Sequence, residues 1–589
     1  MRSPKRIDST VLRAAVLCAT LLTGQAHLQA QSPYARWDNG PSTDPGYFPI
    51  GVWLQSTSPS RVAQYQAIGV NLYVGLWRGP TESQLANLKT AGMQCICSQN
   101  TVGLTSPNRD VIVGWAQQDE PDNAQAASGG GYDPPILPSV IAARYQTMVA
   151  ADDTRPVFLN FGQGVAWDGW VGRGVRTNHP EDYPLYIVGD PDAEPPYGPG
   201  CDIASFDIYP CASSRAEVKD KIWLVAFGVD RLISWSDNET QTVWNFVECT
   251  DIHGDGKATP TQVKAEVWMS IIHGSMGILY FVHQIDPFIE PGLLQDAEMT
   301  AAVSAINWRI RSLAPVLNSP TVVDGAAVQS SSPEVPVDIM VKHHDEDAYL
   351  FAVGMRDGAT TATFQLADFP GSAEAEVIGE DRTVPVAGGA FQDTFSPYAV
   401  HLYRIPLPQA ARVAAWEVAT DHSAAGPYAA PAVDSYVEPR IDGLRRVRIT
   451  FDQPLDPATV NGAAVAVEAM SNPGLLPGHT VSLDITQTVM IVAFDGPLTD
   501  RDVYTLTVAG SVQGADGQPV TGDLDITLRT LAGDVDGSGA VTAADILAAR
   551  AAAGQPLGPG TCRWDVTTSG AVTGDDLLAI RRRLGNALP

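Results

Sequence analysis

Two glutamates that each follow an apolar run are the residues best suited to chemistry in this sequence. Residues 111–122, VIVGWAQQDEPD, place Glu120 just after a run with the character of a buried parallel strand. Residues 242–251, TVWNFVECTD, place Glu248 at the end of a second such run. Glycosidic bond cleavage uses two carboxyl groups, one to protonate the leaving oxygen and one to attack the anomeric carbon or activate water. We therefore predict that Glu120 and Glu248 form a catalytic pair.

Strand-like and helix-like runs alternate through the region that contains both glutamates, residues 47–316. Eight strands, most followed by a helix, within about 270 residues are typical of a (β/α)8 TIM barrel, whose active sites lie at the carboxyl ends of the strands. A doubly wound open sheet is the alternative, but no Gly-rich phosphate loop follows the first strand. The eight runs are residues 48–54, 70–77, 93–100, 111–116, 155–162, 202–210, 242–248 and 276–283.

Polar and aromatic side chains near these strand ends are the candidates for binding a sugar, since sugar rings stack on aromatic faces. The predicted substrate-binding residues are Trp77, Trp115, Asp119, Asn160 and Tyr209. The long connection 163–200, rich in aromatic residues, is predicted to form a wall of the site or to pack on the barrel.

The strand count places Glu120 after the fourth strand and Glu248 at the end of the seventh. This arrangement resembles glycoside hydrolase clan A, the retaining (β/α)8 enzymes, and residues 265–281 resemble the seventh helix and eighth strand of its β-galactosidase-like members. The resemblance implies that Glu120 is the acid/base, Glu248 the nucleophile and Tyr209 a hydrogen-bond partner of the nucleophile. The clan usually has Asn before the acid/base, where this sequence has Asp119, which accepts the same hydrogen bond but adds a negative charge.

Short alternating runs after Pro315 predict two all-β modules. Residues 317–406 are expected to form a β-sandwich and residues 413–530 an Ig-like β-sandwich. Neither module concentrates His, Cys or paired carboxylates, so we assign them spacer and packing roles.

The C-terminal region, residues 531–587, contains a repeat with an offset of 31 residues, DVDGSGAVTAADILAAR and DVTTSGAVTGDDLLAIR. Both copies have the ligand spacing of a calcium loop, with a carbonyl ligand at the seventh position. The expected ligands are Asp534, Asp536, Ser538, Ala540, Thr542 and Asp545 in the first loop, and Asp565, Thr567, Ser569, Ala571, Thr573 and Asp576 in the second. The second loop has fewer carboxylates, so we expect it to bind calcium more weakly.

A strand-like segment, rather than a helix, precedes the first loop, so the module is not a complete EF-hand. Loop-then-helix halves of this kind resemble a type I dockerin, a small α calcium-binding module. The resemblance implies structural calcium and a cohesin-bearing partner protein. No cofactor is expected for catalysis.

Charge and leader composition indicate an exported protein. Residues 1–30 have the basic start, apolar stretch and small residues of a signal peptide. The formal net charge of −29 argues against nucleic acid, whose phosphates are bound by Lys and Arg. No later apolar stretch is long enough to cross a membrane, so we expect a secreted, extracellular or cell-surface protein without membrane insertion.

Six of the seven cysteines follow the signal segment, too few to form the scaffold of the chain. A bridge between Cys211 and Cys249 is one arrangement that the strand positions allow. Asp251, His253 and Asp255 resemble the start of a calcium loop, but its twelfth position, Gln262, falls inside a predicted helix.

Two functions follow from these patterns. The first is a secreted glycoside hydrolase that acts on a polysaccharide or oligosaccharide by a two-glutamate retaining mechanism and is tethered through its dockerin. The second is a non-catalytic carbohydrate-binding or structural component of a cohesin–dockerin assembly, and the presence of both glutamates favours the enzyme.

Overall fold

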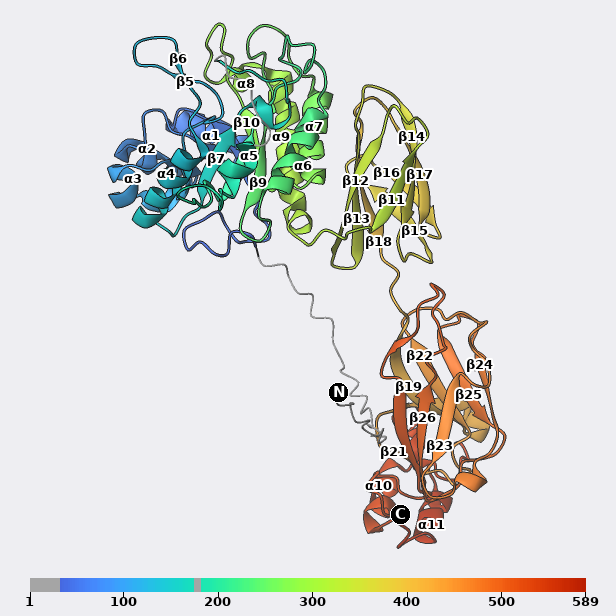
Figure 1. Cartoon of the computed structure of the whole chain (residues 1–589). Coiled ribbons are helices and arrows are strands. Elements are labelled where there is room, and N and C mark those ends of the chain that lie inside the picture. Colours follow the sequence, from blue (N-terminus) through green and yellow to red (C-terminus); the bar gives the residue numbers. More distant parts are fainter. Residues whose placement is uncertain (1–31, 174–181) are drawn as a thin grey trace, which may run out of the picture. The chain divides into compact units, whose positions relative to one another are not determined.

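The computed structural model describes residues 32–173 and 182–589, so the predicted signal segment lies outside the described residues. The chain divides into two compact units, Met1–Thr321 and Val322–Pro589 (Figure 1). Among the described residues, no helix has both the length and the apolar character needed to cross a membrane.

The first unit is a closed barrel of eight parallel strands in the order β1-β10-β9-β8-β7-β4-β3-β2. Every strand lies within one of the eight runs expected from the sequence, so the predicted (β/α)8 barrel is confirmed. The strands are β1 (Ile50–Trp53), β2 (Leu72–Val74), β3 (Gln94–Ser98), β4 (Ile112–Ala116), β7 (Val157–Phe161), β8 (Ile203–Phe206), β9 (Thr242–Glu248) and β10 (Ile278–Phe281).

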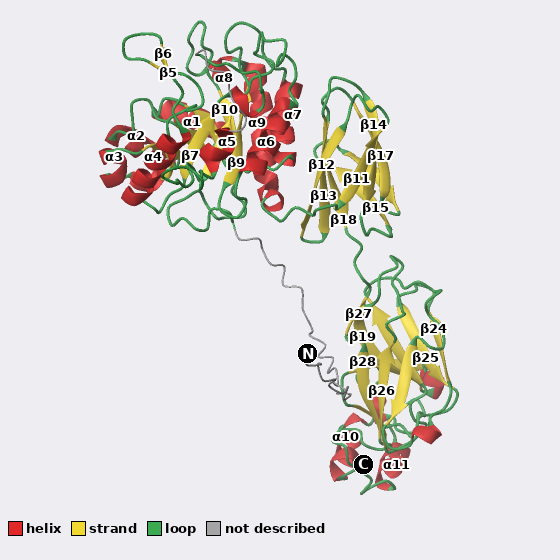
Figure 2. Cartoon of the chain, in the orientation of Figure 1, coloured by secondary structure: helices red, strands yellow, loops and turns green. Residues whose placement is uncertain are grey.

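Helices surround the strands of the barrel (Figure 2). Thr81 and Gln84 form a capping box that begins α2, and Thr259 and Gln262 form another that begins α7. The helices are α1 (Pro59–Ala67), α2 (Glu82–Ala91), α3 (Thr101–Thr105), α4 (Pro138–Ala151), α5 (Asp182–Ile187), α6 (Leu224–Trp235), α7 (Pro260–Ile272), α8 (Gly292–Gln295) and α9 (Ala297–Leu317). A two-stranded hairpin, β5 (Gln125–Ala126) and β6 (Tyr132–Asp133), follows β4.

Apolar side chains from the strands fill the barrel interior, as the continuous apolar runs predict. Strand β9 shows the alternation: Trp244 and Phe246 belong to the interior cluster, whereas Asn245 donates a hydrogen bond to Ser270 of α7. The other buried members include Leu72, Val74, Ile96, Val113, Phe158, Ile203 and Leu279.

The second unit begins with an eight-stranded antiparallel sheet around one apolar core. All eight strands fall within residues 317–406, the range predicted to form a β-sandwich. The strands are β11 (Ala326–Ser330), β12 (Val337–His344), β13 (Asp347–Gly354), β14 (Thr360–Leu366), β15 (Ser372–Val377), β16 (Arg382–Ala387), β17 (Ala390–Phe395) and β18 (Val400–Pro406).

Two further sheets pack around a second core in the same unit. One contains β19 (Arg412–Asp421), β20 (Pro427–Ala432), β22 (Arg446–Phe451), β24 (His479–Leu483), β25 (Val489–Phe494) and β27 (Thr521–Gly522). The other contains β21 (Tyr436–Glu438), β23 (Val465–Ala469), β26 (Asp502–Val508) and β28 (Asp525–Thr530).

The C-terminal region contains two helices, α10 (Ala543–Ala552) and α11 (Gly574–Arg581), each directly after one of the two predicted calcium loops. Strand β28 precedes the first loop, as expected. The helices share an apolar cluster with Val437 of β21 and with Leu531. This region therefore packs on the preceding sandwich instead of forming a separate core.

Gly228 of α6 faces β8 so closely that an added Cβ would lie 2.1 Å from the Phe206 ring. We expect Gly228→Ala to destabilise the barrel by about 1–3 kcal/mol, because overpacking outweighs the gain in helix propensity. Chemical denaturation followed by tryptophan fluorescence measures this change. Phe206→Leu should make the same Gly228→Ala change less costly, and equal costs in both backgrounds would contradict the proposed contact.

Candidate active site

A cavity of about 470 Å³ opens at the carboxyl ends of the barrel strands. Three carboxyl-bearing residues line it, Asp119 and Glu120 after β4 and Asp207 after β8. Aromatic side chains from other strands and loops complete the lining: Trp53, Trp170, Tyr209, Phe246 and Phe281. The cavity thus combines a few acidic groups with aromatic walls, as ligand sites commonly do.

Glu120 is held in the cavity by a strained backbone and by two side-chain contacts. Its φ of 43° lies in the left-handed region, which is costly for a residue with a side chain. Its Oε2 accepts a hydrogen bond from Asn123 Nδ2 at 2.8 Å and pairs with Arg173 Nη2 at 3.0 Å. Arg173 therefore forms a charge-assisted hydrogen bond with the Glu120 carboxylate.

Asn160 of β7 links the other two acids. Its Nδ2 donates to Asp119 Oδ1 at 3.1 Å and to Asp207 Oδ1 at 3.0 Å. Its Oδ1 accepts from Ser205 Oγ at 2.8 Å, which fixes the amide orientation. Because one nitrogen reaches both acids, the two carboxyl oxygens that it contacts are no more than roughly 6 Å apart.

The surroundings of Asp119 and Asp207 favour their protonated forms. Asp119 is exposed to the cavity but has protein on most sides, and this desolvation, with the charge of Glu120, raises its pKa to about 7. Burial, with the charges of Glu120 and Asp119, raises the pKa of Asp207 well above its ordinary value. The cavity therefore combines a carboxylate bound by Arg173 with two acids whose pKa values are raised.

Hydrogen bonds join the long connection after β7 to the turn that carries Glu120. Asp122 accepts hydrogen bonds from the backbone N–H of Gly162 and from Tyr183 Oη at 2.9 Å. Tyr183 stacks on Trp235 of α6, with ring centroids 5.2 Å apart. Tyr183 therefore packs the connection onto the barrel, whereas Trp170 from the same connection lines the cavity. Both roles expected for this segment occur, in different residues.

Glu248 is the main departure from the predicted site. Its carboxylate is fully buried and is not among the described residues that line the cavity. Its two oxygens accept hydrogen bonds from the backbone N–H groups of Cys211, at 2.6 Å, and Ala212, at 2.7 Å. These two N–H groups of the connection after β8 turn the side chain toward α7. The predicted Glu120–Glu248 pair is therefore not assembled in this structure.

Two predicted substrate-binding tryptophans also lie elsewhere. A register shift between β3 and β4 next to Ile96 turns Trp115 out of the barrel, where its Nε1 donates to Asp152. Trp77 is exposed, donates to Glu290 at 2.8 Å and is not among the residues lining the cavity in the described chain. The predictions for Trp115 and Trp77 are corrected accordingly, whereas Asp119, Asn160 and Tyr209 do line the cavity.

Asp207 is the functional candidate that the sequence analysis missed. It follows the apolar run IASF in the same way that Glu120 follows its own run, so the strand-end pattern contained the signal. Cys211 and Cys249 are both free thiols, so the bridge between them is absent from the structure.

The first C-terminal loop gathers oxygen ligands. Carboxyl oxygens of Asp534, Asp536 and Asp545 lie within 4.8 Å of one another. Backbone N–H groups of Ser538 and Gly539 donate to Asp534, and Gly539 has the left-handed φ of 85° that the turn requires. An all-oxygen set of this kind fits calcium.

The second loop has the same backbone pattern but a different neighbour. Asp565 accepts from Ser569 N and Gly570 N, and Asp576 accepts from Thr567 N. Asp565 also meets Nδ1 of the buried His422 at 2.8 Å. The Asp565 carboxylate of the second loop therefore already contacts a side chain of the preceding β-sandwich, His422.

Comparisons with known proteins identify one module of the chain. Residues 434–530 match the family model of a bacterial Ig-like domain, which agrees with the second predicted sandwich. No curated protein matches the sequence.

Solved structures resemble the chain only distantly. An α-amylase from Geobacillus thermoleovorans, complexed with acarbose, is 10% identical, with a TM-score of 0.37 over 62% of this chain and 99% of that one. A GH30 endoxylanase from Clostridium papyrosolvens is 10% identical, with a TM-score of 0.34 over 61% and 96%. A putative α-galactosidase/melibiase from Bacteroides fragilis is 10% identical, with a TM-score of 0.35 over 61% and 79%. Likenesses of this degree say nothing about activity.

The raised pKa values predict an unusual pH dependence of stability. From the ordinary value of 3.8 up to about 7, folded Asp119 and Asp122 retain protons that the unfolded chain has lost. Barrel stability should therefore fall as the pH rises through this window. Asp207→Asn should make the decline shallower, because it removes one of the proton-binding groups.

Tryptophan fluorescence during denaturation measures this dependence, since all tryptophans except Trp416 and Trp564 precede residue 322. Asp153→Asn, a change at an exposed aspartate, is the matched control and should leave the slope unaltered. Equal slopes for wild type and Asp207→Asn would show that Asp207 is an ordinary carboxylate.

Proposed function

We propose that the barrel is a glycoside hydrolase that cleaves O-glycosidic bonds of a polysaccharide or oligosaccharide. The observation that carries the proposal is the pairing, within one aromatic-walled cavity, of a carboxylate held by Arg173 with the buried acid Asp207. Glycoside hydrolysis needs one ionised and one protonated carboxyl group on either side of the scissile bond.

In this proposal Glu120 is the nucleophile and Asp207 the general acid/base. Glu120 suits attack because Arg173 and Asn123 favour its negative charge. Asp207 suits proton donation because burial and its acidic neighbours raise its pKa well above the ordinary value. These roles replace the sequence-based assignment, in which Glu120 donated the proton and Glu248 attacked.

Asp119 and the aromatic walls are assigned to substrate binding. One oxygen of Asp119 faces Asn160, and the exposed carboxyl group leaves the other available to accept a sugar hydroxyl.

The alternative function is a carbohydrate-binding or structural component without turnover. The placing of Glu120 beside the buried acid Asp207 favours the enzyme, because sugar binding alone does not need both a carboxylate bound by Arg173 and a buried acid close to it.

Sugar release from a panel of polysaccharides and oligosaccharides tests the enzyme directly. We expect Glu120→Gln to lose about a thousandfold or more of the wild-type rate on every active substrate. Asp207→Asn should lose as much on polysaccharide but far less on aryl glycosides whose leaving group needs no proton.

Glu248→Gln is the matched control in the same assay. We expect it to keep its turnover rate and to change in thermal stability instead. If the Glu248→Gln variant folds but loses as much activity as Glu120→Gln, the result would support the sequence-based assignment of Glu120 and Glu248 as the catalytic pair. Wild type that binds glycans yet releases no sugar from any of them would favour the binding component.

We further propose that the enzyme is secreted and tethered by a calcium-dependent dockerin to a cohesin-bearing protein. The two C-terminal loops offer oxygen ligands that fit calcium, Asp534, Asp536 and Asp545 in the first and Asp565 and Asp576 in the second. Leu547 of α10 and Leu578 of α11 occupy equivalent repeat positions, and both are exposed. This exposed apolar pair supports a protein partner.

Calcium titration by calorimetry should resolve a tighter and a weaker site. Asp536 and Thr567 both occupy the third loop position, which makes Asp536→Ala and Thr567→Ala a matched pair. The Asp536 variant should weaken the tighter site by about tenfold or more, because the charge of a ligand is lost. The Thr567 variant should leave that site intact, and a reversed outcome would contradict the assignment. Capture on cohesin domains, with and without calcium, tests the partner.

A further inference from the structure

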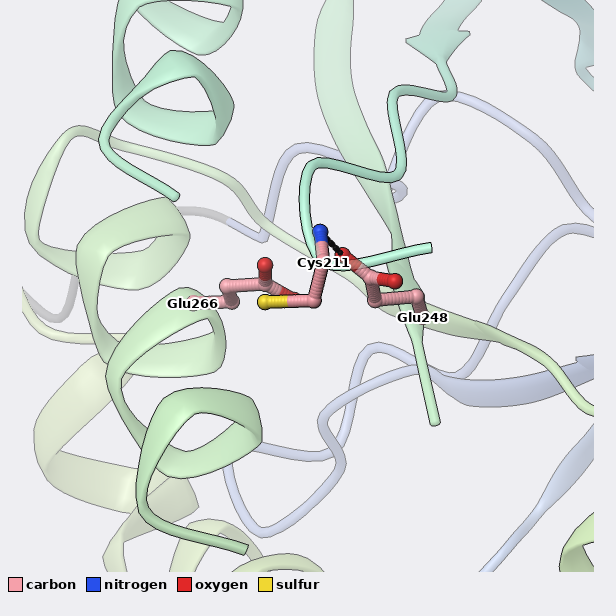
Figure 3. A group of neighbouring side chains, drawn as sticks. All are labelled: Cys211, Glu248 and Glu266. Atoms are coloured by element: carbon pink, nitrogen blue, oxygen red, sulfur yellow. Dashed lines mark hydrogen bonds between the residues drawn. The ribbon is translucent and has the colours of Figure 1, made fainter. Parts of the chain in front are cut away.

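Cys211, Glu248 and Glu266 form a buried group outside the catalytic cavity (Figure 3). Cys211 lies in the connection after β8, Glu248 ends β9 and Glu266 belongs to α7. The Cys211 Sγ and one carboxyl oxygen of each glutamate lie within 4.8 Å of one another. Figure 3 shows Glu266 extending from its helix toward the other two side chains.

The carboxyl group of Glu266 lacks a hydrogen-bond donor other than Glu248 among the described residues. It is fully buried, and apart from the carboxyl group of Glu248, neither of its oxygens has a hydrogen-bond partner in the described part of the chain. Burial, with the charge of Glu248, raises the pKa of Glu266 well above its ordinary value. Two adjacent buried carboxyl groups require something positive between them.

Burial raises the pKa of Glu248 to about 7, and two backbone donors oppose this shift by favouring the charged form. Each of its oxygens accepts one backbone N–H bond and keeps a lone pair for a further partner. The two N–H groups hold the carboxylate in place, in the way that hydrogen bonds to a metal ligand fix its orientation.

A proton or a divalent cation can supply the missing positive charge. A proton on one oxygen of Glu266 leaves the other oxygen buried without a donor, whereas a cation can be bound by both. The thiol also favours a cation, because a thiolate with carboxylates is a ligand set that zinc accepts.

We propose that Cys211, Glu248 and Glu266 bind a structural zinc ion, which links the connection after β8, the end of β9 and α7. Binding releases the thiol proton and any proton on Glu266 to solvent, and the two positive charges of the ion then offset two of the three negative charges of its ligands. The group is closed to solvent, so the ion stabilises the barrel and takes no part in sugar cleavage. This site is independent of the glycosidase proposal.

Metal analysis of the purified full-length protein tests the site, with calcium kept in excess to saturate the C-terminal loops. Wild type dialysed against zinc and then against zinc-free buffer should retain one zinc ion per chain and unfold at a higher temperature than the metal-free protein. Cys211→Ser and Glu266→Gln should each lose the ion. Cys249→Ser is the matched control, since Cys249 is the adjacent buried thiol and lies outside the group.

Cobalt substitution identifies the ligand without depending on stability. Wild type and Cys249→Ser should show a thiolate-to-cobalt charge-transfer band that Cys211→Ser lacks. Wild type that retains no zinc and shows no such band would overturn the proposal and leave a proton shared between the two glutamates. Retention of the ion by Cys211→Ser would equally contradict the assigned ligands.

Discussion

The side chain of Asn160 is the constraint on which the candidate site depends. Ser205 fixes its carbonyl oxygen, so its nitrogen must face Asp119 and Asp207, and its backbone carbonyl accepts from the N–H of Glu120 at 2.9 Å. One buried residue thereby positions acids from two different strand ends. The barrel supplies these neighbours, because parallel strands deliver their carboxyl ends to one rim.

The two acidic groups of the barrel differ because different donors surround them. In the cavity, Arg173 stabilises the charge of Glu120 while burial favours protons on its neighbours. At the end of β9, backbone N–H groups and a thiol surround Glu248, and Glu266 adds a second buried carboxyl group. The first arrangement suits proton transfer to a ligand in an open cavity, and the second suits a bound ion in a closed one.

The sequence predicted the barrel well because apolar periodicity determines where strands form, and it also found Glu120, Asp119, Asn160 and Tyr209 at the cavity. It failed where side-chain direction depends on the tertiary fold. The register shift beside Ile96 turns Trp115 outward. The Glu248 carboxylate binds the backbone N–H groups of Cys211 and Ala212, which are distant from it in sequence. Asp207 directly follows an apolar run, so the strand-end rule that located Glu120 applies to it as well.

The most direct test of the central claim is to trap the glycosyl-enzyme with a fluorinated glycoside of the sugar that the substrate panel identifies, and to map the label by peptide mass spectrometry. The proposed mechanism predicts a covalent sugar on Glu120, since a retaining enzyme forms its intermediate on the nucleophile. A label on Glu248, or turnover of the sugar without any trapped intermediate, would contradict it.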